Sequence, residues 1–404
     1  MFGSIYTALA GMNAYSQGLN VISNNVANLN TPGFKVSDPL FREIVYRQIQ
    51  ESEGSGGGLR PQGAGVEANA AGLSFGQGEL RDTGNDLDVA IDGSGFFVLE
   101  QDDGSYRYTR AGQLTFNDDG ILVERTTGTH VLFNSTEVGN GLFDITDFRS
   151  HAPKATNTVM LSGTLARTST SATYELPTLT VFDSAGTSVA LRGRFTRSSD
   201  DPLSWTVELL GSANTVLGSG TIAFNQDGTP AQDRNSVTIP VSGTGVQPFD
   251  VIFNFGAVGS YAGVSSPATS TSSALQMLKQ DGMTIGSLTG TSFDEQGQLK
   301  LSYSNGQIKT VGKLVLAQFE NPEQLKALGG GMFTMKDGAQ EHLGQAMVSG
   351  IGRVVGRKVE MSNVDLTRQF TDLIILQRGY QASSQVSSIA NELIQTLLAM
   401  DAQR

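Results

Sequence analysis

Apolar side chains recur every seven residues near the N-terminus. The repeat is carried by two interleaved series, whose members include Ile5, Met12, Leu19, Ile22 and Val26. No side chain between residues 1 and 29 is charged. A heptad repeat is typical of an amphipathic helix whose apolar seam packs against a partner helix. The pattern therefore predicts a helix over residues 1–29 that ends in an Asn-rich run.

A second heptad stripe runs from residue 364 to the C-terminus. It consists of Leu366, Leu373, Leu376, Tyr380, Ile394 and Leu397. Gln369, Ser383 and Ser387 interrupt the stripe with polar side chains. At ~1.5 Å per residue, a helix of this length spans roughly 60 Å. We expect the two terminal helices to pack together and then against copies of the same chain. A helical hairpin confined to one chain is the alternative interpretation.

The middle of the chain changes to the period of two that is typical of half-buried strands. One motif occurs four times, namely an aromatic residue, Asp or Asn, two variable residues and Gly. Its copies begin at Phe116, Phe182, Phe224 and Phe293. The Asp or Asn side chain favours a turn, and the glycine permits a positive φ, so each copy predicts a hairpin. The ligand spacing of a calcium loop is missing from all four.

The predicted fold is mainly β with terminal α-helices, in which discontinuous β-domains are nested inside a coiled-coil-like helical domain. Gly-rich and Pro-containing stretches mark the borders. The expected parts are a helical polymerisation domain (1–29 and 364–404), a linker (30–71 and 356–363), a first β-domain (72–149 and 286–355) and an inserted outer β-domain (150–285). The Gly-rich run at 54–58 is expected to be a hinge or a disordered loop. A short helix is expected after Asn321.

The composition argues against most kinds of chemistry. The chain has 404 residues, a net charge of -12 and no Cys. The acidic charge argues against nucleic acid as a partner, and the missing cysteines exclude disulfides and Cys-ligated metals. We find no nucleophile elbow and no zinc-protease motif. Asp86 and Asp88 could form a carboxylate pair, but we interpret them as a solvated strand face. We therefore expect no enzyme activity, no cofactor and no metal.

The first 29 residues also lack the basic start and the continuous apolar run of a secretory signal or membrane span. We therefore expect neither a cleaved signal of this type nor insertion into a membrane. If the protein leaves the cell, it uses another route.

Several short motifs resemble those of bacterial flagellar axial proteins, the rod and hook subunits. The first includes Asn24, Asn25, Asn28, Gly33 and Phe34, and continues to Lys35. Others are Leu87–Phe97, Tyr108–Gly112 and a C-terminal pair of motifs, which contain Asn363, Gln377, Arg378 and Gln381. The chain length and the inserted segment resemble hook subunits more than the shorter rod subunits. Gly379 departs from the pattern, because the family often has a bulkier residue there.

This resemblance implies a subunit that polymerises into a curved hollow tube outside the cell, at the flagellar hook and basal body. The tube would couple the rod to the filament as a universal joint. Implied partners are rod subunits, a hook cap protein, hook–filament junction proteins and the flagellar type III export apparatus. Two alternatives stay open: a distal rod-type subunit, and a secreted adhesin-like module whose β-domains carry the function.

Overall fold

The computed structural model describes residues 2–49, 60–135, 139–211, 214–243, 246–336, 340–348 and 350–401. The chain forms two compact units. Unit 1 comprises Met1–Thr146, Thr291–Leu301 and Lys309–Arg404, and unit 2 comprises Asp147–Gly290 and Ser302–Ile308. Strand-rich structure between two terminal helices confirms the predicted fold class. The Gly-rich run at 54–58 lies outside the described residues.

Unit 1 contains both helices. Its elements are α1 (Phe2–Ala27), β1 (Ser37–Ile49), β2 (Arg60–Leu73), β3 (Leu80–Asp82), β4 (Val89–Asp92), β5 (Phe96–Glu100), β6 (Tyr106–Thr109), β7 (Leu114–Phe116), β8 (Leu122–Glu124), β9 (His130–Val131), β10 (Phe133–Ser135), β11 (Gly139–Gly141), β25 (Leu316–Phe319), η3 (Pro322–Gln324), β26 (Leu325–Gly329), β27 (Met332–Met335), β28 (Glu341–Gly344), β29 (Arg353–Gly356), β30 (Lys358–Glu360) and α2 (Leu366–Asp401).

Unit 2 is built mainly from strands. Its elements are η1 (Thr146–Phe148), β12 (Ser150–His151), β13 (Thr158–Thr164), β14 (Thr173–Phe182), β15 (Ser188–Arg197), β16 (Ser204–Leu210), β17 (Val216–Ala223), β18 (Ser236–Gly243), β19 (Val246–Asn254), β20 (Val264–Ser265) and β21 (Ala274–Gln280). Three further strands cross the boundary between the units, namely β22 (Gly286–Phe293), β23 (Gln298–Tyr303) and β24 (Ile308–Leu314).

The main sheet of unit 1 follows the order β26-β27-β6-β5-β9-β8-β7, and β25 joins β5 to β28. Its strands bury aromatic rings in one cluster. Phe96 lies at the centre, with the rings of Phe75, Phe319 and Phe333 around it at centroid distances of 5.6, 5.5 and 6.1 Å. These near-perpendicular contacts give the β part of unit 1 a core of its own.

Two sheets enclose the core of unit 2. One has the order β18-β19-β13-β20 with β21 against β13, and the other has the order β14-β15-β16-β17. Side chains of β16 alternate, so that Trp205, Val207 and Leu209 are buried while Thr206 is exposed. This alternation is the period of two that the sequence predicts, and Trp205 is a core residue as expected.

All four repeated motifs form the predicted turns. Their glycines, at positions 120, 186, 228 and 297, have φ between 68 and 90°. In each copy the glycine N–H donates to the carbonyl oxygen of the Asp or Asn three residues earlier. The structure therefore confirms the hairpin interpretation, and the positive φ explains why glycine closes each motif.

Two predictions of local structure are wrong. Residues 30–71 are not a simple linker, because β1 and β2 form a long antiparallel hairpin whose register runs from Ser37–Leu73 to Ile49–Arg60. The expected helix after Asn321 is only the three-residue turn η3, which leads into β26. β26 pairs with β27, and this pairing provides the backbone hydrogen bonds that a helix would otherwise supply.

Candidate assembly surface

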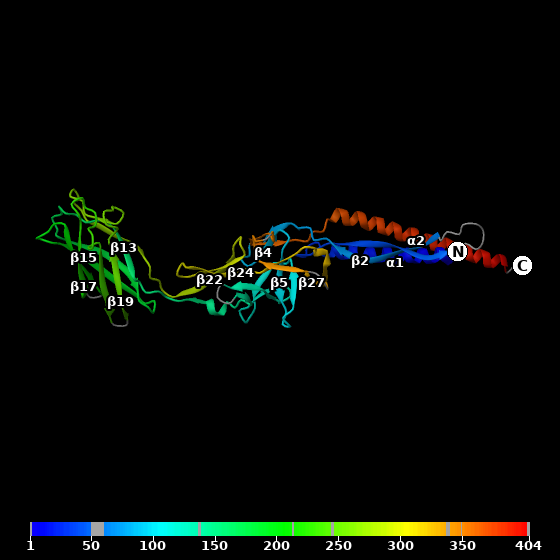
Figure 1. The fold of residues 1–404 in the computed structure, drawn as a ribbon, viewed down its shortest axis with the longest axis horizontal. Coiled ribbons are helices and arrows are strands. Elements are labelled where there is room, and N and C mark those ends of the chain that lie inside the picture. The colour runs from blue at the N-terminus through cyan, green and yellow to red at the C-terminus, as the bar shows by residue number, and fades with distance from the viewer. Residues whose placement is uncertain are drawn as a thin grey trace. The chain divides into compact units, whose positions relative to one another are not determined.

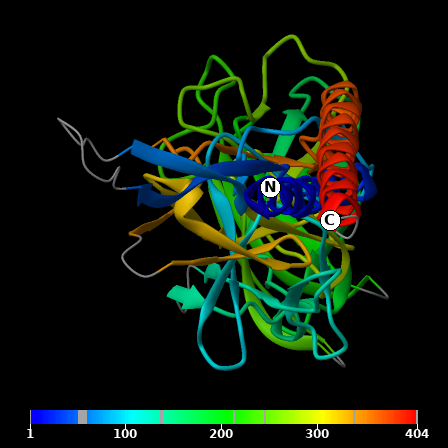
Figure 2. The same ribbon diagram turned by 90° about the vertical axis from the view of Figure 1, so that its right-hand side faces the viewer.

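Helices α1 and α2 lie side by side and run antiparallel, with both termini at the same end of the pair (Figure 1). In the end-on view of Figure 2, α1 lies between α2 and the β1–β2 hairpin. Four pairs face each other along the helices: Asn25 with Gln369, Gly18 with Leu376, Tyr15 with Gly379 and Gly11 with Ser383. From each pair to the next, the residue number in α1 decreases by the same amount as the residue number in α2 increases. The helices therefore keep one register throughout.

Glycines allow the two helices to approach closely. A Cβ atom on Gly379 would lie 2.6 Å from Cζ of Tyr15, and one on Gly18 would lie 3.0 Å from Cδ1 of Leu376. Both distances are shorter than an ordinary van der Waals contact. The seam inside the subunit is thus built mainly from small and polar residues. The polar positions Gln369 and Ser383, which the sequence suggested were interruptions, are part of this seam.

Many large apolar side chains of the helices lie outside the seam and are exposed, although Ile22 and Leu376 are buried. Their exposed members are Tyr6, Leu9, Phe370, Ile374, Ile375, Tyr380, Val386, Ile389, Leu393, Leu398 and Met400. Ile389 and Leu393 are 50% and 52% exposed, and they lie on one face because they are four residues apart. Exposed apolar side chains that share one helix face mark a contact site for another molecule.

Asn25 anchors the base of the helix pair. Its Nδ2 donates to Oε1 of Gln369 at 2.8 Å and to the carbonyl oxygen of Ser37 at 2.8 Å. Its Oδ1 accepts from the backbone N–H of Ser37 at 3.1 Å. Asn363 has a similar role, because it accepts from the N–H of Val36 and donates to two carbonyl oxygens. Asn25 holds the chain where it leaves α1, and Asn363 holds it where it enters α2.

A buried ion cluster lies close to this base. Glu360 accepts from Nζ of Lys35 at 2.6 Å and from Nη1 of Arg110 at 3.1 Å. The guanidinium of Arg110 also stacks over the ring of Phe96 at 4.8 Å. Burial lowers the pKa of Lys35, and Arg110 lowers it further, whereas Glu360 raises it. One carboxylate therefore pairs with bases from two distant segments, and Glu360 also accepts the N–H of Gly78.

The structure places the predicted helix residues in different environments. Ile22 and Leu376 are buried in the subunit, and Tyr380 is exposed. The remaining ones are half-buried, namely Ile5, Met12, Leu19, Val26, Leu366, Leu373 and Ile394. The side chain of Leu397 lies outside the described part. Their role in contacts between subunits stays a prediction.

The predicted motif residues divide into buried anchors and exposed positions. Asn25 and Gly33 are buried, Asn28, Phe34 and Asn363 are half-buried, and Asn24, Gln377, Arg378 and Gln381 are exposed. Gly33 has a φ of 72°, and a Cβ atom there would lie 2.5 Å from the backbone N of Ala111. This close approach explains why glycine occupies the position.

Sequence reasoning missed two charged groups. The sequence analysis did not name Glu360. The motifs that contain Lys35 and Arg110 could have indicated that a carboxylate pairs with these two bases. Asp88 is not on a solvated face, because it is 2% exposed and its Oδ1 accepts from Nη2 of Arg125 at 2.7 Å. In the described ranges, no three His, Asp or Glu side chains are grouped to hold a metal. No described helix is long and apolar enough to span a membrane.

Three family models match the chain in sequence order. Residues 5–35 match the flagella basal body rod protein, 90–147 the D1 domain of the hook proteins FlgE/F/G, and 356–400 the C-terminal part of the basal body rod FlgEFG proteins. Each region contributes one member of the buried cluster: Lys35, Arg110 and Glu360 respectively. The three matched regions thus meet at one point of the fold.

Three relatives that match nearly the whole chain are flagellar hook proteins. The flagellar hook protein FlgE of Borreliella burgdorferi is 28% identical over 99% of this chain and 100% of its own length. The FlgE proteins of Treponema pallidum and Escherichia coli are 27% and 28% identical over 99% and 97% of this chain, and over 100% and 98% of their own lengths. The chain is similar to flagellar hook proteins over nearly its whole length.

Similarity to hook proteins over nearly the whole chain indicates a structural role in the flagellar hook, without enzyme activity, and a location at the hook and basal body. It also indicates a subunit of a polymeric flagellar assembly. The matches do not favour the rod-type or adhesin-like alternatives. A solved hook protein, Helicobacter pylori FlgE2, is similar over 70% of this chain and 100% of that chain, with 12% identity and a TM-score of 0.48.

Proposed function

We propose that the helix pair of α1 and α2 joins copies of this chain into a hollow helical tube that transmits torque from the rod to the filament. The observation that supports this proposal is the exposure of many large apolar side chains of the helices. The seam within the subunit is closed by small and polar residues, so Ile389, Leu393 and their neighbours stay available for other copies. Burying such side chains stabilises an interface by roughly 1.5–3 kcal/mol each.

In this proposal, residues 1–29 and 364–404 form the polymerisation domain, and 150–285 form an outer domain. Contacts between different patches of identical subunits produce an open helix rather than a closed ring. Residues 1–29 carry no charge, so stacking many copies of α1 brings no like charges together. Rod subunits, the cap protein, the junction proteins and the type III export apparatus are the partners that this assembly would need.

A charge on the exposed apolar face tests the proposal. We expect Ile389→Asp and Leu393→Asp to raise the critical concentration for tube formation by about 100-fold or more, as a charge in the centre of an interface costs several kcal/mol. Helix content by circular dichroism should not change in the monomer. Electron microscopy and sedimentation measure the outcome.

Ser384→Asp is the matched control, because Ser384 is an exposed polar residue of α2 and receives the same charge. Ile22→Asp is unsuitable, since Ile22 is buried within the subunit and the charge would disrupt the helix pair itself. Normal tubes from both Ile389→Asp and Leu393→Asp would contradict the proposal.

A further inference from the structure

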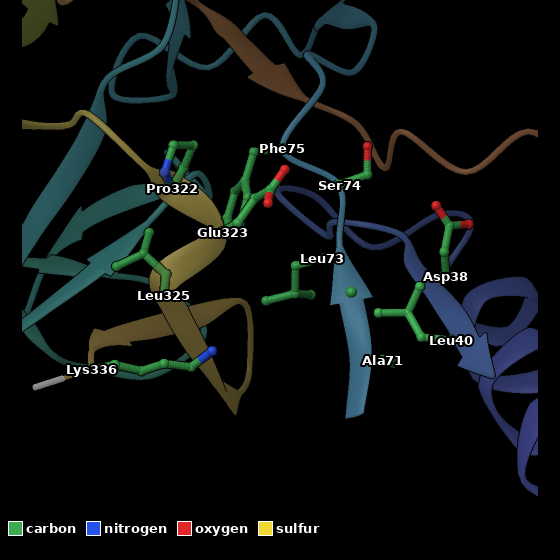
Figure 3. A pocket seen from close by; sticks show the side chains of 11 residues that line it. Asp38, Leu40, Ala71, Leu73, Ser74, Phe75, Pro322, Glu323, Leu325 and Lys336 are labelled. Carbon is green, nitrogen blue, oxygen red and sulfur yellow. The ribbon is translucent and has the colours of Figure 1, made fainter. Parts of the chain in front are cut away.

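A groove of about 610 Å³ opens beside the base of the helix pair. Figure 3 shows that Leu40 and Leu73 line it from the β1–β2 hairpin, while Pro322 and Leu325 line it from η3 and β26. Phe75 forms part of its apolar lining and packs on the aromatic cluster of unit 1. This volume lies within the range of ~300–1,000 Å³ typical of pockets that hold a ligand. The groove is therefore large enough for several apolar side chains.

Among the residues that the structure describes, no helix of the same subunit packs beside the last turns of α2. In the register of the helix pair, Phe2, the first described residue of α1, lies level with Glu392. α2 continues to Asp401, past the N-terminal end of α1 (Figure 1). Leu398 and Met400 in this overhang are 65% and 71% exposed. Because short helices are marginal in water, an apolar overhang needs packing from elsewhere.

We propose that the groove of one subunit receives the α2 overhang of a second copy of this chain. This inference rests on the proposed function, because it names the contact that extends the tube. An open polymer of identical chains requires two different surfaces that complement each other. The overhang projects apolar side chains, and the groove is a hollow that presents Leu73, Phe75 and Leu325 beside the charged Asp38, Glu323 and Lys336. Both belong to unit 1. Leu393 and Met400, which lie seven residues apart on one face of α2, pack into the groove between Leu73 and Leu325.

The contact cannot form within one subunit. Arg368, in the first turn of α2, pairs with Asp38 on the rim of the groove at 3.3 Å. Met400 lies about 48 Å further along the helix at ~1.5 Å per residue. The overhang of each chain is therefore far from its own groove. A covalent link between the two positions necessarily joins two copies.

Cysteine cross-linking tests this contact directly, because the natural chain contains no Cys. Leu40 and Met400 are both exposed, so Leu40→Cys and Met400→Cys can be combined in the full chain. After assembly into tubes and treatment with a short bismaleimide, we expect a ladder of covalent multimers in a denaturing gel. Each single variant should yield no species larger than a dimer.

The matched control combines Met400→Cys with Ile308→Cys, because Ile308 is also exposed and lies in unit 2. This control should give no ladder. Normal tubes from the Leu40→Cys/Met400→Cys chain without a ladder would overturn the inference and leave the proposed function intact. If the parent chain forms no tubes, the proposed function itself fails.

A groove-filling variant provides a second test. Ala71 lines the groove, so Ala71→Trp should occupy it and raise the critical concentration for assembly by about tenfold, whereas Ala71→Ser should not. An unchanged critical concentration for Ala71→Trp contradicts the docking of any segment there. Ala71→Trp could slow assembly while the Leu40→Cys/Met400→Cys chain gives no cross-linked ladder. That result would mean that another segment occupies the groove, and it would also overturn the inference.

Discussion

At the scale of single residues, Glu360 connects three segments that are far apart in the sequence. Lys35 follows α1, Arg110 follows β6, and Glu360 ends β30. All three side chains are at most 2% exposed. A buried ion pair is costly to desolvate, so it seldom adds much stability. Losing one member is more damaging, because the remaining charges stay buried without a counter-ion.

Replacing Glu360 with Gln should therefore lower the free energy of unfolding of unit 1 by about 3–5 kcal/mol. Urea denaturation followed by far-ultraviolet circular dichroism measures this change. Arg353→Gln is a suitable control, since Arg353 forms an exposed pair with Asp92 and should cost at most about 1 kcal/mol. Equal effects of the two substitutions would show that the buried cluster has no special importance.

At the scale of the elements, the distance between α1 and α2 depends on Gly379. The ring of Tyr15 occupies the space where a larger side chain would lie. Gly379→Leu should push the helices apart and destabilise the pair by roughly 1–3 kcal/mol, which is typical of overpacking. Thermal unfolding followed by circular dichroism measures the loss.

Adding Tyr15→Ala to Gly379→Leu should restore much of this stability, because the smaller side chain opposite makes room for the leucine. The matched control is Gln377→Leu, at an exposed position two residues earlier. No recovery in the double variant would mean that the clash is not the cause.

The sequence predicted the two helices and their pairing, and Gln369, Leu376 and Ser383 of the observed seam lie on the predicted stripe. It did not predict which members of the stripe stay exposed. The heptad analysis assigned the seam to the largest apolar residues and treated Gln369 and Ser383 as interruptions. Periodicity detects a stripe that some partner covers, but it cannot tell a partner in the same chain from one in another copy. Small residues such as Gly11 and Gly18 give no hydrophobic signal, although they determine how closely the helices approach.

The hairpin of β1 and β2 was missed for a related reason. The Gly-rich run between the strands suggested a linker, and the strands lack a clear alternation. Their stability comes from pairing with each other and from packing against α1. Such non-local contacts override local propensity. The turns were easier to predict, because Asp or Asn followed by Gly fixes them locally.

At the scale of the whole molecule, each unit has its own hydrophobic core. Trp205, the single tryptophan of the chain, is 1% exposed in the core of unit 2. Its fluorescence therefore reports on unit 2, while the far-ultraviolet signal of the helices reports on unit 1.

We expect Glu360→Gln to shift the urea midpoint of the helical signal and to leave the midpoint of Trp205 fluorescence unchanged. Separate cores imply separate cooperative transitions. Leu209→Ala, which removes a buried side chain from the same core and the same face of β16 as Trp205, is the converse control and should shift only the fluorescence midpoint. If both signals shift together for either variant, the units unfold as one.

The constant register of α1 and α2 restricts how the gene can change in length. Deleting one codon between Gly11 and Gly18 would rotate the preceding part of α1 by about 100°. Gly11 and Ala8 would then leave the seam, and bulky neighbours would replace them. Length changes in α1 are thus compatible with the pair only in steps of whole heptads, together with an equal change in α2. Insertions are free of this constraint in the exposed turns of unit 2, so unit 2 can vary in length while the helices keep theirs.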